Sequence, residues 1–173
     1  MNILITGGTG FIGAPLSREL RSNGHSDTVT TRSQTGARYK LTWNPPDLIP
    51  QDVISTFDAV INLAGEPIAP QRWSIERKKR ILSSRIDTTR ALVESMKNAY
   101  TRPKVLVSAS AIGYYGAHGD EAVTEGTLPG DDFLADVCKQ WEAEAYKALD
   151  MGVRVVTVRI GGVLEADGGA LPQ

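Results

Sequence analysis

Apolar and polar positions follow two kinds of pattern that alternate along the chain. Short apolar runs predict buried strands; they fall at 1–6, 28–31, 58–64, 104–108 and 153–159. Between them, apolar residues recur every three or four positions, which predicts amphipathic helices; these fall at 12–23, 74–99 and 132–149. Such alternation is typical of βαβ units and indicates an α/β fold, a doubly wound parallel sheet with helices on both faces.

The remaining segments are predicted loops, and their position in the fold indicates where a ligand would bind. A proline-rich stretch carries Pro45, Pro46 and Pro50, and a Gly- and acid-rich stretch covers 113–131. In open α/β sheets, ligands bind beyond the carboxyl ends of the strands. Functional residues are therefore expected at 7–13, 31–33, 64–67 and 108–116, and after Arg159.

Composition and charge exclude several classes of protein. The chain has 173 residues, 41% of them hydrophobic and 23% charged, which fits one globular domain. A formal charge of −1 offers no basic excess for nucleic acid. No apolar run approaches the roughly 18 residues of a membrane span, and the amino terminus lacks the basic start of a signal peptide. With one cysteine, Cys138, the chain can form no internal disulfide. We expect a cytoplasmic protein without metal, nucleic-acid or membrane partners.

A glycine-rich loop directly follows the first predicted strand. It reads TGGTGFIG and contains the spacings G-x-G-x-x-G and G-x-x-G-x-x-G before the first helix. In this context the glycines allow a tight turn and a close approach to a pyrophosphate, while the helix start offers free N–H groups. The predicted cofactor-binding residues are Gly7, Gly8, Thr9, Gly10, Phe11, Ile12 and Gly13. The alternative is a tight turn that binds nothing.

The end of the second strand indicates which dinucleotide is bound. An acid there would bind the ribose hydroxyls of NAD, whereas an arginine can pair with the 2′-phosphate of NADP. Arg32 and Ser33 follow this strand, and Asp27 lies at its beginning. The sequence therefore favours NADP over NAD, with Arg32 as an ordinary surface arginine being the alternative.

Three segments together, TGGTGFIG, INLAGEPI and VLVSASAIGYYG, resemble the extended short-chain dehydrogenase/reductase superfamily, within its NAD(P)-dependent epimerase/dehydratase group. The ordered series AGEPI, RW, SR, TTRALVE, FLADVCKQWE and RIGGVL is similar to its atypical SDR39U1-type "epimerase family" branch over nearly the whole chain. The resemblance implies a Rossmann domain over 1–173, with Ala64, Gly65 and Ser108 near the cofactor. It also implies that 160–173 begins the connection to a C-terminal substrate domain that this sequence lacks.

The resemblance implies a catalytic set of Ser or Thr, Tyr and Lys, which this sequence matches only in part. Ser110 occupies the serine position. In the next helix the Tyr and Lys positions fall on Leu134 and Cys138, or on Phe133 and Val137 in the neighbouring register. Neither register supplies the pair. The Y-x-x-x-K at 100–104 contains Pro103, which prevents a continuous helix, so we interpret it as unrelated.

Other residues near the serine strand could move a proton. Tyr114 is the first candidate, ahead of Tyr115 and His118, and the alternative for each is a packing or solvated role. Asn62 is interpreted as a polar cap of its strand rather than as a catalytic group. Cys138 is expected to pack rather than react.

The basic stretch 72–80 has two interpretations. It is an exposed helix face, which we favour, or an anion-attracting rim of the site. Trp73 is either a lid or a core residue.

Two functions are consistent with these residues. The first is an NADP-dependent oxidoreductase or nucleoside-diphosphate-sugar epimerase-like enzyme acting on a small hydroxyl- or carbonyl-bearing substrate, without the usual Tyr–Lys pair. The alternative is a non-catalytic NADP-binding regulatory or sensor protein. The 173 residues alone are expected to be inactive, and oligomerisation stays open.

Overall fold

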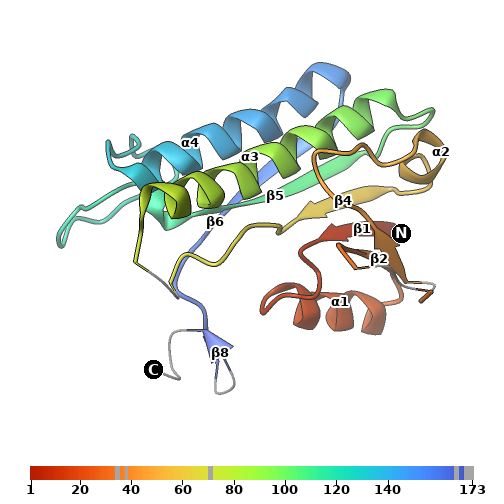
Figure 1. Ribbon diagram of the computed structural model, residues 1–173, viewed down its shortest axis with the longest axis horizontal. Helices are drawn as coiled ribbons and strands as arrows, with labels where there is room; N and C mark the ends of the chain where they lie inside the picture. The colour runs from red at the N-terminus through yellow and green to blue at the C-terminus, as the bar shows by residue number, and fades with distance from the viewer. Residues whose placement is uncertain (34–35, 38, 70–71, 166–167, 170–173) are drawn as a thin grey trace.

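A computed structural model describes residues 1–33, 36–37, 39–69, 72–165 and 168–169. Six parallel strands form one sheet in the order β3-β2-β1-β4-β5-β6. The strands are β1 (Asn2–Thr6), β2 (Ser26–Thr31), β3 (Lys40–Thr42), β4 (Ala59–Asn62), β5 (Val105–Ala111) and β6 (Arg154–Ile160). The helices are α1 (Gly13–Ser22), α2 (Gln51–Ile54), α3 (Ile75–Asn98) and α4 (Phe133–Tyr146), with 3₁₀ turns η1 (Ile112–Tyr114) and η2 (Lys147–Met151). The doubly wound sheet is confirmed (Figure 1).

The helices cover the sheet from both sides. Helices α3 and α4 run side by side over one face, and α1 lies on the other (Figure 1). Leu4, Val60 and Leu106 of the central strands pack under α3 and α4. Ile3 and Ile5 point to the opposite face, where they join Leu20 of α1. Burial on both faces explains why these strands read as continuous apolar runs.

Side-chain caps set the beginnings of the two long helices. Ser74 precedes α3 and accepts a hydrogen bond from the Arg77 N–H, and Asp132 does the same for Ala135 at the start of α4. Each cap satisfies an N–H that the helix leaves unpaired. The predicted ends of α3 at 74 and 99 lie within one residue of the observed ones, and α4 gives way to η2 at Lys147.

The proline-rich stretch holds two elements that the sequence pattern does not predict. Strand β3 adds to the outer edge of β2, with Thr31 opposite Thr42, and α2 follows at Gln51. Both are very short, so neither shows a repeat long enough to identify. A further small antiparallel pair, β7 (Leu164–Glu165) and β8 (Gly168–Gly169), lies beyond β6, and 166–167 and 170–173 of the predicted connection lie outside the described residues.

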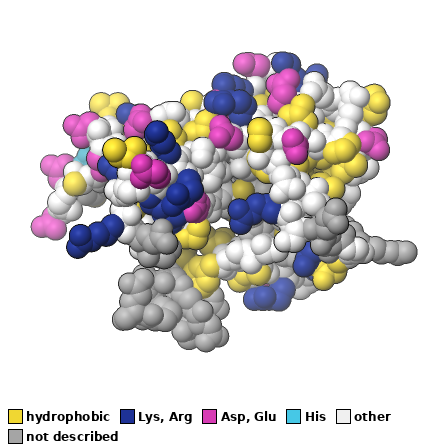
Figure 2. Space-filling model, viewed as in Figure 1, with side chains coloured by type: hydrophobic (Ala, Val, Ile, Leu, Met, Phe, Trp, Pro, Cys, Tyr) yellow, Lys and Arg dark blue, Asp and Glu magenta, His cyan; other side chains and the backbone are white. Residues whose placement is uncertain are grey.

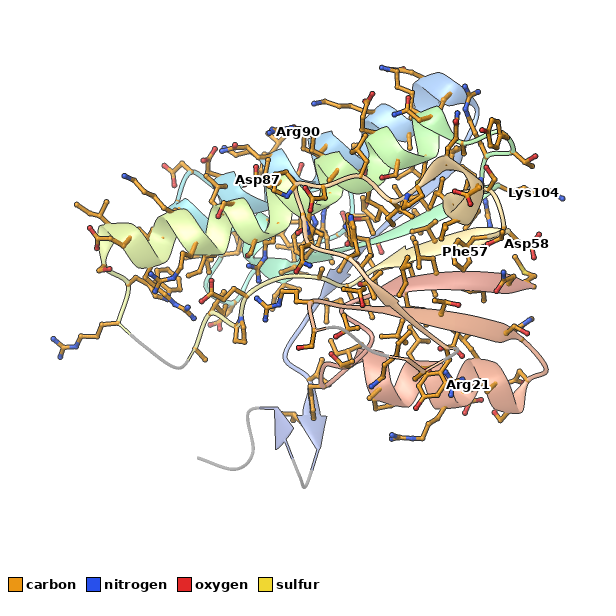
Figure 3. All side chains as sticks on the ribbon, turned by 45° about the vertical axis from the view of Figure 1, so that its right-hand side comes forward. Arg21, Phe57, Asp58, Asp87, Arg90 and Lys104 are labelled. Atoms are coloured by element: carbon orange, nitrogen blue, oxygen red, sulfur yellow. The ribbon has the colours of Figure 1, made fainter. Side chains whose placement is uncertain are left out.

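The outer surface of α3 and α4 carries charges of both signs (Figure 2). Asp87 and Arg90 lie together on α3, and Arg90 also bonds Glu144 of α4 at 2.8 Å (Figure 3). A hollow of about 560 Å³ beside Arg90 is lined by residues of α3, α4 and η2 and by Arg102, and not by the glycine loop. This surface is therefore separate from the predicted site.

The Y-x-x-x-K segment lies at the amino ends of the strands, and β6 is the outermost strand on one side of the sheet. Lys104 and Asp58 lie at the amino ends of β5 and β4, so the Y-x-x-x-K at 100–104 is at the end opposite the glycine loop (Figure 3). Strand β6 is the last strand of the sheet, and its Val156 and Val158 are 38% and 44% exposed.

Candidate functional site

The glycine loop joins β1 to α1 in a conformation that a side chain would prevent. Gly7 has a φ of +67°, and a Cβ added there would lie 2.7 Å from the Leu63 carbonyl oxygen. A Cβ on Gly13 would lie 2.4 Å from the Gly7 oxygen. The two glycines thus allow the loop to pack closely against the end of β4 and the start of α1.

The loop leaves backbone donors available where α1 begins. Gly10 is exposed, and its N–H returns to Gly7 at 3.0 Å. No group among the described residues accepts from the N–H groups of Phe11, Ile12 and Gly13. Because the helix dipole also favours negative charge here, the residues present fit a bound diphosphate.

Arg32 and Ser33 follow β2 at the same edge of the sheet, and both are exposed. Asp27 lies at the other end of β2, where its carboxylate accepts hydrogen bonds from Ser17 at 2.7 Å and from Arg21. Asp27 is therefore a structural partner of α1. The described residues at the carboxyl end of β2 include no carboxylate that could bind a ribose.

Asn62 connects the carboxyl ends of β1, β4 and β5. It accepts from the Thr6 hydroxyl at 2.6 Å and donates to Thr89 of α3 at 2.8 Å and to Ser108 at 3.4 Å. The Thr6 hydroxyl accepts from the Ala64 N–H at 3.3 Å. The side chains of Thr6, Asn62, Thr89 and Ser108 are fully buried, and their network holds the backbone at the half-buried Ala64. This agrees with the interpretation of Asn62 as a polar cap.

The segment after β4 is fastened to α3. Arg77 is 5% exposed and bonds both the Glu66 carboxylate and the Pro67 carbonyl oxygen. The Ser84 hydroxyl accepts from the Glu66 N–H at 3.0 Å. The basic stretch 72–80 is therefore only partly a solvated face, because Arg77 fixes the loop that follows Gly65.

Trp73 is partly packed and partly exposed, so it combines features of its two predicted roles, a lid residue and a core residue. Its ring packs edge-on against Phe133 of α4, with centroids 5.6 Å apart, and its Nε1–H donates to the Ile68 carbonyl oxygen. The side chain still keeps 39% of its surface exposed. Trp73 thus anchors the segment before α3 to the start of α4.

Ser110 belongs to a buried charged cluster. Its hydroxyl donates to the Glu142 carboxylate at 2.6 Å, and Ser110 is only 2% exposed. Arg159 donates to both oxygens of the same carboxylate at 2.9 Å, and Glu142 raises the pKa of Arg159 above its usual value. The Ser110 proton is therefore engaged within the fold.

The two tyrosines after β5 differ in their environment. Tyr115 is buried, and its hydroxyl accepts from Arg159 at 3.0 Å. The Tyr114 ring lies under the Arg159 guanidinium, with 3.4 Å between the guanidinium carbon and the ring centroid. Among the described residues the Tyr114 hydroxyl has no hydrogen-bond partner, so it is the freer of the two phenols.

The positions of the expected Tyr–Lys pair are filled by apolar contacts and a thiol. Leu134 packs against Gly113, where an added Cβ would lie 3.2 Å from the Leu134 Cβ. Cys138 is buried, its Sγ lies 3.7 Å from the Ala111 carbonyl oxygen, and burial raises the pKa of its thiol. Neither Leu134 nor Cys138 supplies a phenol or an ammonium.

Sequence reasoning missed four residues that organise this edge of the sheet: Thr89, Arg85, Glu142 and Arg159. A glutamate on the buried side of α4 next to Trp141 is the signal that could have identified Glu142, because a buried carboxylate requires a cation.

Comparison with known proteins agrees with this arrangement. The model of the NAD dependent epimerase/dehydratase family matches residues 3–164. The chain is 43% identical to an Arabidopsis thaliana protein named "Epimerase family protein SDR39U1 homolog, chloroplastic", over 99% of the chain and 51% of that protein. It is 37% identical to the Bacillus subtilis epimerase family protein YfhF, over 99% of the chain and 58% of that protein.

Two solved structures are similar over 99% of the chain. Human epimerase family protein SDR39U1 with NADPH has a TM-score of 0.84 and 33% identity, with 57% of it covered. A nucleoside-diphosphate sugar epimerase from Corynebacterium glutamicum has a TM-score of 0.87 and 35% identity, with 36% of it covered. The chain thus spans little more than half the length of the curated relatives.

One further observation concerns membranes: no helix among the described residues is both long enough and apolar enough to cross one.

The glycine loop, the free N–H groups at the start of α1 and the family match over 3–164 lead to one conclusion. The chain belongs to the NAD dependent epimerase/dehydratase family, and its parallel sheet with helices on both faces is a Rossmann-type fold.

Proposed function

We propose that this chain forms the cofactor-binding part of an NADP-dependent oxidoreductase or nucleoside-diphosphate-sugar epimerase-like enzyme, and that it prefers NADPH to NADH. The observation that carries the proposal is the exposed Arg32 at the end of β2, one strand away from the unbonded N–H groups of Phe11, Ile12 and Gly13. A guanidinium at this point pairs with a 2′-phosphate, whereas NAD needs an acceptor for its ribose hydroxyls. The similar human protein was solved with NADPH, which supports the same preference here.

Each group at the sheet edge has a distinct task in this proposal. When bound, the dinucleotide supplies or accepts a hydride. The N–H groups at the start of α1 hold its diphosphate. Asn62 fixes Ser108 directly and Ala64 through the Thr6 hydroxyl. Tyr114 is the residue that passes a proton to or from the substrate oxygen, because its hydroxyl is not engaged by the described residues. Ser110 acts through Glu142, which bonds Arg159, and the Arg159 guanidinium lies over the Tyr114 ring.

Titration of NADPH and NADH against the wild type and Arg32→Ala tests the cofactor assignment. We expect the variant to lose about 1–3 kcal/mol of NADPH affinity, roughly 5- to 150-fold, with little change for NADH. Arg102→Ala is the matched control, since Arg102 is also exposed but precedes β5 at the opposite end of the sheet. Unchanged NADPH affinity in Arg32→Ala would refute the assignment.

A second function is favoured by a specific observation. Leu134 and Cys138 stand where the catalytic pair is expected, which suits a protein that binds NADP without turnover and reports its occupancy to a partner. Following NADPH absorbance with carbonyl compounds and sugar nucleotides, in the natural protein and in Tyr114→Phe, separates the two functions. Turnover that Tyr114→Phe abolishes supports the enzyme, whereas tight NADPH binding without turnover supports the sensor.

A further inference from the structure

Arg85 of α3 brings its guanidinium against the segment that follows β4. Its Nη2 donates to the Glu66 carbonyl oxygen at 3.1 Å, and its Nη1 donates to the Ile81 carbonyl oxygen at 3.0 Å. A Cβ added to Gly65 would lie 3.0 Å from the guanidinium carbon. The glycine therefore allows the cation to approach the backbone at the predicted cofactor edge.

The guanidinium of Arg85 bonds no carboxylate among the described residues, because the nearby Glu66 carboxylate is bonded to Arg77. None of the ion pairs among the described residues includes it, whereas Arg77 and Arg159 each bond a carboxylate. Its side chain is half-buried, and this burial lowers its pKa, although an arginine stays charged at neutral pH. Keeping a cation partly out of water without a carboxylate is unfavourable. An oxygen-rich ligand would offset this cost.

Arg85 also has N–H groups that no group among the described residues accepts. A guanidinium has five N–H donors, and the bonds within the described residues are those to Ile81, Ser84 and Glu66. The Nε–H and one Nη2–H are left over. The plane of the group is supported by Trp141 of α4, whose ring centroid lies 5.2 Å from the guanidinium carbon. The donors are thus held in a fixed orientation.

The strand order places Arg85 near the nicotinamide-ribose half of a dinucleotide bound at the glycine loop, and away from its adenosine half. Arg32 follows β2, the glycine loop follows β1, and Gly65 follows β4, on the other side of β1 from β2. A dinucleotide with its 2′-phosphate at Arg32 and its diphosphate at the loop therefore extends its nicotinamide-ribose half across the end of β4. Arg85 borders this path, while the adenosine half lies two strands away.

We propose that Arg85 binds oxygen atoms of the nicotinamide-ribose half of the dinucleotide, through the two N–H groups that the fold leaves over. This proposal rests on the proposed function, because it assumes the same bound NADPH. The proposal also bears on Cys138, which occupies the position of the expected lysine and carries no positive charge. Cys138 lies one helical turn before Trp141, and the Arg85 guanidinium lies over the Trp141 ring. Arg85 of α3 thus supplies positive charge next to this position of α4.

Calorimetric titration with two ligands tests the proposal. NADPH carries both halves, whereas adenosine 2′,5′-bisphosphate carries only the half that Arg32 is expected to hold. We expect Arg85→Met to weaken NADPH about tenfold, the loss of a hydrogen bond from a charged donor, and to leave the bisphosphate within twofold. Arg85→Lys keeps the charge and should lose less. Arg90→Met, on the outer side of α3, should change neither affinity.

Each outcome of the titration has a defined meaning. Equal NADPH affinity in the wild type and Arg85→Met overturns the proposal, and so does an equal loss of both ligands, which would show that Arg85 only holds the loop. If Arg85→Met does not fold, as judged by its circular dichroism, Arg85→Gln and Arg85→Lys provide the same comparison. A wild type that binds neither ligand refutes the proposed function instead, so the two failures are distinguishable.

Discussion

Replacing Glu142 with glutamine changes one atom and should lower the stability of this fold. Glu142 is 4% exposed, and its carboxylate accepts one hydrogen bond from Ser110 and two from Arg159. Glu142→Gln removes the charge and turns one acceptor into a donor that faces the Arg159 guanidinium. We expect the free energy of unfolding to fall substantially, because a buried cation loses its counter-charge.

The structure sets the size of this effect. Removing one partner of a buried ion pair costs about 3–5 kcal/mol. Arg159 keeps its bonds to Tyr115 and to the Glu125 carbonyl oxygen, and the glutamine keeps one acceptor, so we expect about 2–3 kcal/mol. For a chain of this length that corresponds to a decrease in melting temperature of roughly 4–12 °C.

Glu144→Gln is the matched control, on the same helix and with the same chemical change. Glu144 is also buried, but its partners Arg90 and Lys147 both have side chains that are 57% exposed. Water can therefore replace the lost interaction, and we expect a loss of about 0–1 kcal/mol. Urea unfolding followed by far-ultraviolet circular dichroism measures both variants. Equal losses, or a loss below about 1 kcal/mol for Glu142→Gln, would refute the reasoning.

Three further substitutions test other parts of the site. Gly13→Ala should lower the free energy of unfolding by about 1–3 kcal/mol and abolish NADPH binding, because the added methyl would overlap the Gly7 oxygen. The control is Gly36→Ala, which has open space around it; urea unfolding should show a free energy of unfolding within about 0.5 kcal/mol of the wild type. Asn62→Ala should lower stability by about 2–4 kcal/mol, because it leaves buried hydroxyls unpaired; a loss under about 1 kcal/mol would contradict the network. Burial raises the pKa of Cys138, so the unfolded thiol ionises first as the pH rises. Stability should therefore decline from about pH 8.5 upward until the native thiol also ionises, and the measurement is the urea midpoint as a function of pH. The same pH profile in the wild type and in Cys138→Ala would exclude this contribution.

The sequence pattern predicts those parts of the fold whose signals are local. The glycine loop, the end of α1 near Asn23, and the beginnings of α3 and α4 next to Ser74 and Asp132 each depend on neighbouring residues. Each lies where the sequence pattern predicts it. Strand β3 could not be predicted in the same way. Three residues carry no measurable alternation, and its pairing with β2 depends on the rest of the sheet being present.

The charged cluster could not be predicted because its members are distant in sequence. Ser110, Glu142 and Arg159 come from β5, α4 and β6 and meet only when the sheet forms. The motif predicts Ser110 as a candidate, but a motif does not show where the hydroxyl points. The role of Ser110 in catalysis and the cytoplasmic location both stay predictions.

The exposed valines at the end of the sheet have a consequence for handling the protein. Val156 and Val158 present an apolar surface on a strand that has no neighbour on its outer side within the described residues. Unpaired strand edges of this kind are templates for self-association. Concentrated samples should therefore accumulate oligomers through this edge. Val158→Lys should suppress them, as light scattering would show, without altering the dinucleotide site.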